Sequence, residues 1–346
     1  MIELSQLTIH LSTFKLWDIN LKINTGEFFI LLGPTGSGKT LILESIIGIV
    51  PITKGKIWIN EYDMTEMPPE KRNVGIVYQD YALFPHMTVI ENIRFGLSYL
   101  KGNREDHNKR IYDLMAQTGI LKLAERSIAH LSGGEKQRAA LVRALAVNPS
   151  ILLLDEPLSA LDPCFRDDIQ KLLKQLHEQT GTTFLMVTHD FAEALFLGER
   201  GAILNHGKIE QMGHMNDLFK SPETPFVARF MGIKNIFEAT FEGNLACIKD
   251  IELNIETEIK PHYKYIAFRG EDIYLHKSKP TDEKTINTFP VKITDIVDRG
   301  PYCELSVRMS WCELNVILTK GELITNKYYE IKNIFLTIPP LSIHAF

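Results

Sequence analysis

The sequence has 346 residues, of which 45% are hydrophobic and 23% are charged, and this composition excludes wholesale disorder. A chain of that length usually exceeds what one hydrophobic core can hold, so we expect two domains. The formal net charge of -5 argues against a protein that binds nucleic acid by neutralising phosphates. No apolar run approaches the ~18 residues of a membrane span, so any work at a membrane would need a partner that spans it.

Residues 1–232 alternate short apolar runs with longer helical patterns, which is typical of a largely parallel sheet covered by helices. The runs "EFFILLG", "ILLLDEP" and "TFLMVTHD" predict buried central strands that lead into polar residues. Ligands of open α/β sheets bind at the carboxyl ends of such strands. We therefore expect the functional site of this domain where these strands end.

Residues 233–346 have a different pattern, because the long helical stretches stop after Met231-Gly232. Short β-rich stretches follow one another between turn residues, among them "IELNIETEI", "KYIAFRG", "PVKITDIV" and "CELNVIL". This spacing predicts a second, all-β domain that forms a small barrel or sandwich.

The motif "GPTGSGKT" follows the first predicted strand and precedes the helical run "LILESIIG". Its glycines let backbone N–H groups surround a β-phosphate, while Lys39 reaches the β- and γ-phosphates and Thr40 ligates Mg²⁺. The alternative is a glycine-rich turn that serves packing alone. The expected nucleotide contacts are Gly33, Pro34, Thr35, Gly36, Ser37, Gly38, Lys39 and Thr40.

Four polar residues at other predicted strand ends suit the same chemistry. Asp155 can face the metal, and the adjacent Glu156 can act as general base on a water aimed at the γ-phosphate. His189 in "VTHD" could contact the γ-phosphate or hold that water, although a histidine at a strand end is more often structural. Gln79 in "VYQD" has an amide oxygen that can ligate Mg²⁺, or it is an ordinary surface amide.

A second phosphate cradle is predicted at "LSGGEKQR", residues 131–138. A serine hydroxyl, the N–H groups of two glycines and the start of a helix together suit a phosphate. The chain already has one predicted phosphate cradle, so the role of the second has to be explained.

Six motifs in order resemble the nucleotide-binding subunit of an ATP-binding-cassette transporter: "GPTGSGKT", "VYQD", "LSGGEKQR", "ILLLDEP", "SALD" and "THD", within residues 33–190. The resemblance implies a P-loop NTPase cassette with a RecA-like core, a helical subdomain and an antiparallel β subdomain. It also implies a head-to-tail homodimer in which each ATP lies between the first cradle of one subunit and "LSGGE" of the other. The second cradle would then serve the ATP of the partner subunit.

The resemblance assigns further residues to this shared site. Contacts to the ATP of the partner subunit are implied for Ser132, Gly133, Gly134 and Gln137, with Gln137 at the ribose. The loop that couples the two sites corresponds to Ser159, Ala160, Leu161 and Asp162. For the aromatic that stacks on adenine we favour Phe14 over Leu11 and Trp17, although Phe14 could equally be a core aromatic.

Two other regions indicate which class of transporter the chain resembles. The segment "YALFPHMTVIENIRFGL", residues 81–97, is similar to the family region that grips a membrane permease, although it also suits an ordinary helical core. The β-rich tail containing "FRGEDIYL" resembles the OB-like regulatory domain of an importer branch. The chain most resembles the ATPase of molybdate/tungstate importers, with sulfate-type importers next, and sugar, polyamine and iron importers remain alternatives.

This resemblance implies ATP and Mg²⁺ as cofactors and transmembrane permease subunits as partners, with an extracytoplasmic substrate-binding protein acting through the permease. It implies a peripheral location on the cytoplasmic face of the membrane and no nucleic-acid partner. A cassette ATPase acting on ribosomes or DNA is less compatible with one cassette and no sustained heptads. A binding module without catalysis conflicts with the intact set of Lys39, Asp155, Glu156 and His189.

The regulatory domains of this branch can bind the oxyanion through a Ser-Ala-Arg-Asn-like motif and a lysine near the C-terminus. Here the matching stretch is "KTINTF", with Ile286 at the arginine position and Asn287 kept, and Pro339 stands where the lysine is expected. Losing both cations removes the charge-assisted hydrogen bonds that hold a dianion, so we expect no oxyanion feedback. The neutral donors that remain are Thr285, Thr288 and Ser342.

Overall fold

The computed structural model describes residues 1–100, 103–280 and 286–346, and for residue 164 the backbone alone. The chain divides into two compact units, residues 1–218 and 219–346. The boundary between the units lies before residue 232, where the sequence pattern changes, because residues 219–232 are bonded to the rest of the second unit. Arg269 donates a hydrogen bond of 2.9 Å to the carbonyl of Phe219, and a ring nitrogen of His344 lies 3.0 Å from the carbonyl of Pro222.

The first unit is built on a six-stranded sheet in the order β10-β9-β3-β8-β7-β6. Its strands are parallel except for β10, which pairs antiparallel with β9. Their bounds are β3 (Phe28–Leu32), β6 (Val74–Val77), β7 (Ile151–Asp155), β8 (Thr183–Thr188), β9 (Arg200–Asn205) and β10 (Lys208–His214). The three predicted central strands are β3, β8 and β7, which are neighbours and buried along their whole lengths.

A second, antiparallel sheet has the order β2-β1-β4-β5. Its strands are β1 (Ile2–His10), β2 (Lys15–Ile23), β4 (Lys54–Ile59) and β5 (Tyr62–Asp63). Apolar side chains alternate along β1 and β2, so one face of the sheet joins a core shared with α1, β3, β7, β8 and β9. This sheet is the antiparallel β subdomain that the resemblance implied.

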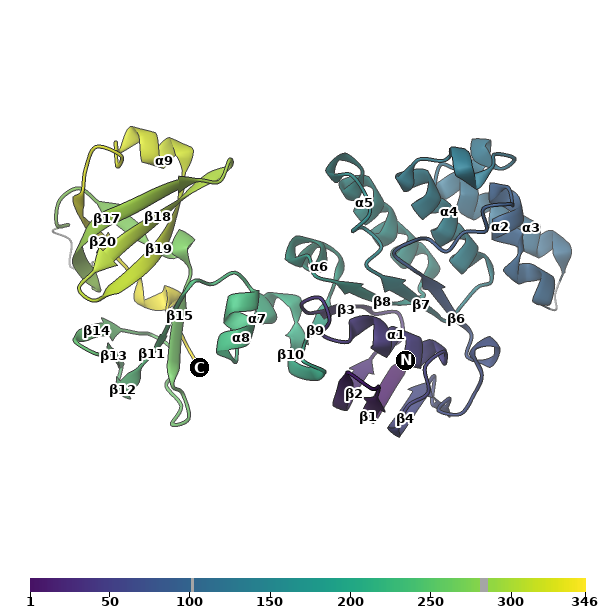
Figure 1. The fold of residues 1–346 in the computed structure, drawn as a ribbon, viewed down its shortest axis with the longest axis horizontal. Coiled ribbons are helices and arrows are strands. Elements are labelled where there is room, and N and C mark those ends of the chain that lie inside the picture. The colour runs from purple at the N-terminus through teal and green to yellow at the C-terminus, as the bar shows by residue number, and fades with distance from the viewer. Residues whose placement is uncertain (101–102, 281–285) are drawn as a thin grey trace. The chain divides into compact units, whose positions relative to one another are not determined.

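Helices cover both faces of the parallel sheet, with α1 on one side and α5 and α6 on the other (Figure 1). The helices are α1 (Lys39–Ile47), α2 (Val89–Arg94), α3 (Arg104–Gln117), α4 (Gly133–Ala146), α5 (Pro163–Thr180), α6 (Phe191–Leu197) and α7 (Met215–Lys220). Because α2 and α3 both pack on α4, these three form the expected helical subdomain. Short 3-10 turns occupy Pro69–Lys71, Gly96–Tyr99, Leu121–Leu123 and Ile128–His130.

The second unit consists mainly of antiparallel sheets, which confirms the predicted all-β domain. Its sheets have the orders β11-β15-β21, β12-β13-β14 and β16-β20-β17-β18-β19. The elements are α8 (Pro225–Phe230), β11 (Asn235–Glu238), β12 (Thr240–Glu242), β13 (Leu245–Ile248), β14 (Ile251–Asn254), β15 (Tyr265–Phe268), β16 (Tyr274–His276), β17 (Thr288–Asp298), β18 (Tyr302–Met309), β19 (Cys312–Thr319), α9 (Lys320–Thr325), β20 (Asn333–Thr337) and β21 (His344–Ala345), with 3-10 turns at Gly270–Asp272 and Pro340–Ser342.

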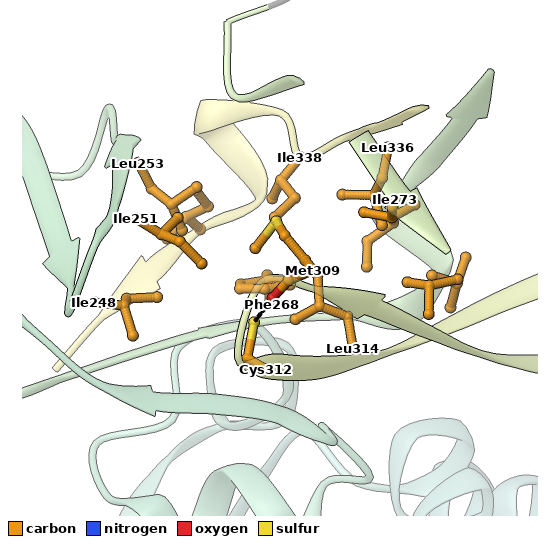
Figure 2. Packing of buried hydrophobic residues seen from close by; sticks show 14 of the residues in the cluster. Ile248, Ile251, Leu253, Phe268, Ile273, Met309, Cys312, Leu314, Leu336 and Ile338 are labelled. Carbon is orange, nitrogen blue, oxygen red and sulfur yellow. Dashed lines mark hydrogen bonds between the residues drawn. The ribbon is translucent and has the colours of Figure 1, made fainter. Parts of the chain in front are cut away.

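One hydrophobic cluster joins the sheets of this unit (Figure 2). Met309 and Leu314 extend from the hairpin of β18 and β19 toward Phe268 of β15, and the thiol of Cys312 donates a hydrogen bond of 3.2 Å to the carbonyl of Met309. Each contributing strand places alternate side chains into the cluster, which is why the sequence shows period-2 stretches here. In the part of the chain that the structure describes, no helix has the length and hydropathy needed to cross a membrane.

Candidate active site

A tight loop joins the buried strand β3 to α1 and carries the first predicted phosphate cradle. We call this loop the P-loop. Its last glycine, Gly38, has φ 104 and precedes the first helical residue. A Cβ atom added at Gly38 would lie 2.8 Å from Cε1 of Phe14, so both the backbone conformation and the close approach require glycine. The loop therefore wraps closely, with Phe14 against its end.

Lys39 lies folded onto this loop. Its Nζ donates hydrogen bonds of 2.8 Å to the carbonyl of Gly33 and 3.0 Å to that of Pro34. The side chain is buried, and this burial lowers the pKa of Lys39, while the carboxylates of Glu156 and Asp155 act in the opposite direction. An ammonium held by two neutral carbonyls can exchange them for phosphate oxygens, which are stronger acceptors.

Thr40 and Asp155 form an oxygen-rich corner beside the loop. The Thr40 hydroxyl donates a hydrogen bond of 3.1 Å to Oδ1 of Asp155 at the end of β7. Burial raises the pKa of Asp155, and the hydrogen bond from Thr40 partly opposes that shift. Gln79 lines the same cleft. A hydroxyl, a carboxylate and an amide oxygen are the donors that a hard cation such as Mg²⁺ prefers, so these residues fit the predicted metal.

Glu156 follows β7 with φ 44, a left-handed conformation that residues other than glycine seldom adopt. Its backbone N–H donates to the carbonyl of Val187, which fixes the turn against β8. The side chain is 19% exposed; Oε1 lies 3.9 Å from Lys39 Nζ and Oε2 lies 3.2 Å from His189 Nδ1. One carboxylate thus stands between a lysine and a histidine at the carboxyl ends of two neighbouring strands.

Most of these groups line a cleft of about 700 Å³, which we call the P-loop cleft. Phe14, the predicted adenine contact, and Leu11 are in its lining, whereas Trp17 is not. Trp17 instead packs beside Lys15, whose Nζ lies 4.8 Å from its ring. The lining residues are Leu11, Phe14, Thr35, Gly36, Gly38, Lys39, Thr40, Leu41, Glu44, Gln79, Asp155 and Glu156.

Sequence reasoning missed Glu44 in this lining. Glu44 lies on α1 one helical turn after Thr40, so it shares the face of the helix that borders the cleft. That i, i+4 spacing was the available signal. The carboxylate of Glu44 also contributes to the raised pKa of Asp155, although less than burial does.

The second predicted cradle does not line this cleft. Ser132 caps α4: its Oγ accepts a hydrogen bond of 3.3 Å from the N–H of Glu135, and the Glu135 carboxylate accepts from the N–H of Ser132 at 2.8 Å. Ser132 and Gly133 are exposed, while Gly134 is buried. The start of α4 is therefore presented outward, away from the P-loop of its own subunit.

Gln137, the expected ribose contact, is buried in this structure. Gln137 has no exposed area, and among the described residues neither its amide nitrogen nor its amide oxygen has a hydrogen-bond partner. The motif marks Gln137 as part of the second cradle, but its side chain is buried on the inward side of α4. It could reach a ribose only if the side chain left the interior.

The predicted coupling loop is attached to the turn at Glu156. Ser159 donates to the carbonyl of Glu156 twice, from its hydroxyl at 2.9 Å and from its N–H at 3.2 Å. Ala160 and Asp162 are exposed, while Leu161 is buried and anchors the loop. A displacement of this loop would therefore act directly on the backbone of Glu156.

In the second unit, the amide of Asn287 is fully used inside the fold. Its nitrogen donates hydrogen bonds to the carbonyls of Asn254 (2.8 Å) and Ile338 (3.1 Å), and its oxygen accepts from the N–H of Asn254 at 2.7 Å. The Thr288 hydroxyl lies 2.8 Å from that of Thr337. Lys284 and Thr285 lie outside the described residues. The Asn287 amide therefore has no N–H left for an oxyanion.

Comparisons with known proteins show the family of the chain. The sequence matches the ABC transporter family over residues 16–159. It is 35% identical over 346 residues to the molybdate/tungstate import ATP-binding protein of Pyrococcus abyssi, covering 100% of both chains. It is 39% identical over 303 residues to the spermidine/putrescine import ATP-binding protein of Legionella pneumophila, covering 85% of this chain and 82% of that protein.

Two solved structures share the cassette fold. One is a dimeric ATP-binding cassette in a post-hydrolysis state bound to ADP and Pi, at 33% identity and TM-score 0.56, covering 62% of this chain and 99% of that one. Another is cbiO1 from Clostridium perfringens, part of an ABC transporter complex, at 26% identity and TM-score 0.59, covering 67% and 98%. The chain belongs to the ABC transporter ATP-binding proteins. Its activity is ATP hydrolysis coupled to import.

Proposed function

We propose that this chain energises the uptake of molybdate or tungstate. The alignment with the molybdate/tungstate relatives of Pyrococcus abyssi and Pyrococcus horikoshii carries this proposal, since it spans 100% of each chain and so includes the whole second unit. A polyamine importer is the second candidate. The relative from Vibrio cholerae supports it with 41% identity, over 78% of this chain and 74% of that protein.

The proposed hydrolysis rests on the position of the Glu156 carboxylate. Glu156 polarises the attacking water, and His189 at 3.2 Å holds the carboxylate and the water in line with the γ-phosphate. Lys39 leaves the loop carbonyls for the phosphates. Thr40, Asp155 and Gln79 would hold Mg²⁺, which when bound offsets the charge of the β- and γ-phosphates. Phe14 contributes the aromatic face for adenine.

We further propose that two copies act as a head-to-tail homodimer. Ser132 and the glycines after it would bind the γ-phosphate of the ATP held by the other subunit. The outward-facing start of α4 supports this arrangement, because an exposed helix N-terminus favours an anion. A solved relative is a dimer bound to ADP and Pi, which is consistent with it.

The permease is expected to dock on the aromatic surface near residues 81–97. Phe95 and Tyr99 are 37% and 77% exposed, and the ring of Phe84 lies 4.5 Å from that of Phe95. Exposed aromatic side chains that contact one another suit a protein interface. The chain would then sit peripherally on the cytoplasmic face of the membrane, and an extracytoplasmic binding protein would deliver the substrate to the permease.

Reconstitution tests the substrate. Vesicles would be prepared with ATP inside and would contain the chain, the permease encoded by a neighbouring gene, and the binding protein encoded beside it. Uptake of tungstate, molybdate, sulfate and spermidine would then be measured in parallel. We expect uptake of tungstate and molybdate alone, abolished by Glu156→Gln. Uptake of spermidine without either metal oxyanion would assign the chain to the second candidate.

A further inference from the structure

A second cleft lies in the second unit, and none of the predicted ATP-site residues lines it. Its volume is about 1140 Å³, larger than that of the P-loop cleft. One side is a single extended segment, Ile236 to Phe241, which runs from β11 into β12. Small-ligand pockets usually span ~300–1,000 Å³, so this open cleft suits an elongated occupant better.

The segment along this cleft consists of two outer strands. β11 ends the sheet β11-β15-β21, and β12 ends the sheet β12-β13-β14 (Figure 1). Within the described residues, β11 pairs with β15 and β12 pairs with β13, each on one side. An outer strand offers unpaired backbone N–H and C=O groups, which an added strand can satisfy.

The cleft also offers apolar and aromatic contacts. Phe237, Phe241 and Tyr263 are half-buried in its lining. Trp311 is 41% exposed there and is held from two sides, because its indole N–H donates to Asp250 and Lys249 Nζ lies 4.0 Å from its ring centre. A fixed, half-exposed tryptophan is typical of the anchoring point of an interface.

The charged residues that line the cleft are mainly basic. Lys249, Lys260 and Lys264 are exposed in its lining, and Glu238 is the one acid among the described lining residues. Lysines can also guard an outer strand against aggregation. A guard needs only the charges, however, whereas here they border an open cleft that also has aromatic side chains in its lining. Charge complementarity therefore points to an acidic occupant.

We propose that this cleft binds an extended acidic segment of a partner protein by strand addition along β11 and β12. Apolar side chains of the segment would pack on Phe237, Phe241 and Trp311, and its acidic side chains would face Lys260 and Lys264. The site does not depend on ATP hydrolysis or on which substrate is imported. It provides the second unit with a ligand of a different class from an oxyanion.

Peptide selection on the full-length chain tests the proposal. Random peptides about 12 residues long, enough to span the segment when extended, would be displayed on phage and selected on the immobilised protein. Enriched peptides would be synthesised with a fluorophore and titrated by anisotropy. We expect acidic sequences with alternating apolar residues. Failure to enrich any such sequence would overturn the proposal.

Charge-reversal variants locate the binding. Lys260→Glu combined with Lys264→Glu is expected to weaken the selected peptides by about tenfold or more. The matched control is Lys292→Glu combined with Lys332→Glu, which makes the same charge change at exposed positions of the same unit outside the cleft. Equal weakening in both variants would mean general electrostatic attraction. Binding unaffected by either would place the peptides elsewhere, and both outcomes contradict the proposal.

N-methylated peptides separate strand addition from side-chain binding. Methylating every second backbone nitrogen removes the donors on one edge of an extended peptide. We expect one of the two alternate sets to abolish binding and the other to leave it nearly unchanged. Equal tolerance of both sets would exclude strand addition. A second copy of the chain is the remaining candidate occupant. The cleft would be assigned to it if unlabelled full-length chain displaced the labelled peptide and if the variant with Lys260→Glu and Lys264→Glu no longer dimerised.

Discussion

The P-loop cleft and the segment around Asn287 both carry polar groups that a ligand could use, but they hold them differently. In the cleft, Lys39 rests on two exchangeable carbonyls, and the buried hydroxyl of Ser37 has no hydrogen-bond partner among the described residues. Around Asn287, both amide N–H groups and the amide oxygen are bonded to the backbone of Asn254 and Ile338. A binding motif can therefore bind a ligand only where its polar groups are still available.

The largest expected effect lies in the cleft. Glu156→Gln keeps the size of the side chain but removes the base, so the ATP hydrolysis rate should fall by roughly 10²–10⁴-fold while ATP binding remains. Steady-state phosphate release and nucleotide binding measure the two properties separately. Glu178→Gln, an exposed change on α5, is the control. Hydrolysis near the wild-type rate would remove Glu156 from the mechanism.

The second prediction concerns the segment around Asn287. Asn287→Ala removes the partners of three backbone groups, of which the bond to Ile338 is buried, and puts alanine at φ 63, so the free energy of unfolding of the second unit should fall by about 3 kcal/mol. Calorimetry measures the change, and basal ATP hydrolysis should be retained. Ile286→Ala, at a neighbouring side chain that is 47% exposed, is the control and should stay within ~0.5 kcal/mol. Tight tungstate binding lost with Asn287→Ala would show that the amide serves a ligand instead.

The third prediction tests the ring contact in the cleft. Phe14→Ala should weaken ATP binding by about 1 kcal/mol, roughly fivefold, with little change in the maximal rate. Trp17→Ala serves as the control because Trp17 does not line the cleft. Titration with a fluorescent ATP analogue measures both variants. A larger loss with Trp17→Ala would reverse the assignment.

The smallest effect concerns the buried carboxylate Asp155. Burial raises the pKa of Asp155, so the native state binds the proton more tightly than the unfolded chain does. Ionised Asp155 therefore lowers the free energy of unfolding once the pH rises above the usual carboxyl pKa. Asp155→Asn should therefore raise the free energy of unfolding of the first unit at neutral pH, by about 0.5 kcal/mol. The gain should shrink as the pH falls through the raised pKa of Asp155, and it should be gone below the usual carboxyl pKa. Denaturant unfolding from pH 3 to 8 tests this, and a gain that persists at low pH would contradict it.

Much of the fold and of the P-loop site follows from local sequence. β3, β7 and β8 could be predicted because each is an uninterrupted apolar run, and the P-loop could be predicted because its glycine spacing meets a local backbone requirement. Gln137 could not be placed, because a motif does not say which side of α4 faces the interior. The role of Asn287 depends on Asn254 and Ile338, which lie far away in the sequence, so no local pattern reveals it.

The shared site between two copies is tested most directly by mixing two inactive variants. Lys39→Ala disables the P-loop, and Ser132→Arg blocks the cradle that serves the other subunit. A mixed dimer would contain one site with both halves intact, so the mixture should recover roughly a quarter of the wild-type ATP hydrolysis if pairing is random. The recovered rate should rise more steeply than linearly with protein concentration. A mixture as inactive as either variant alone would contradict a site built from two copies.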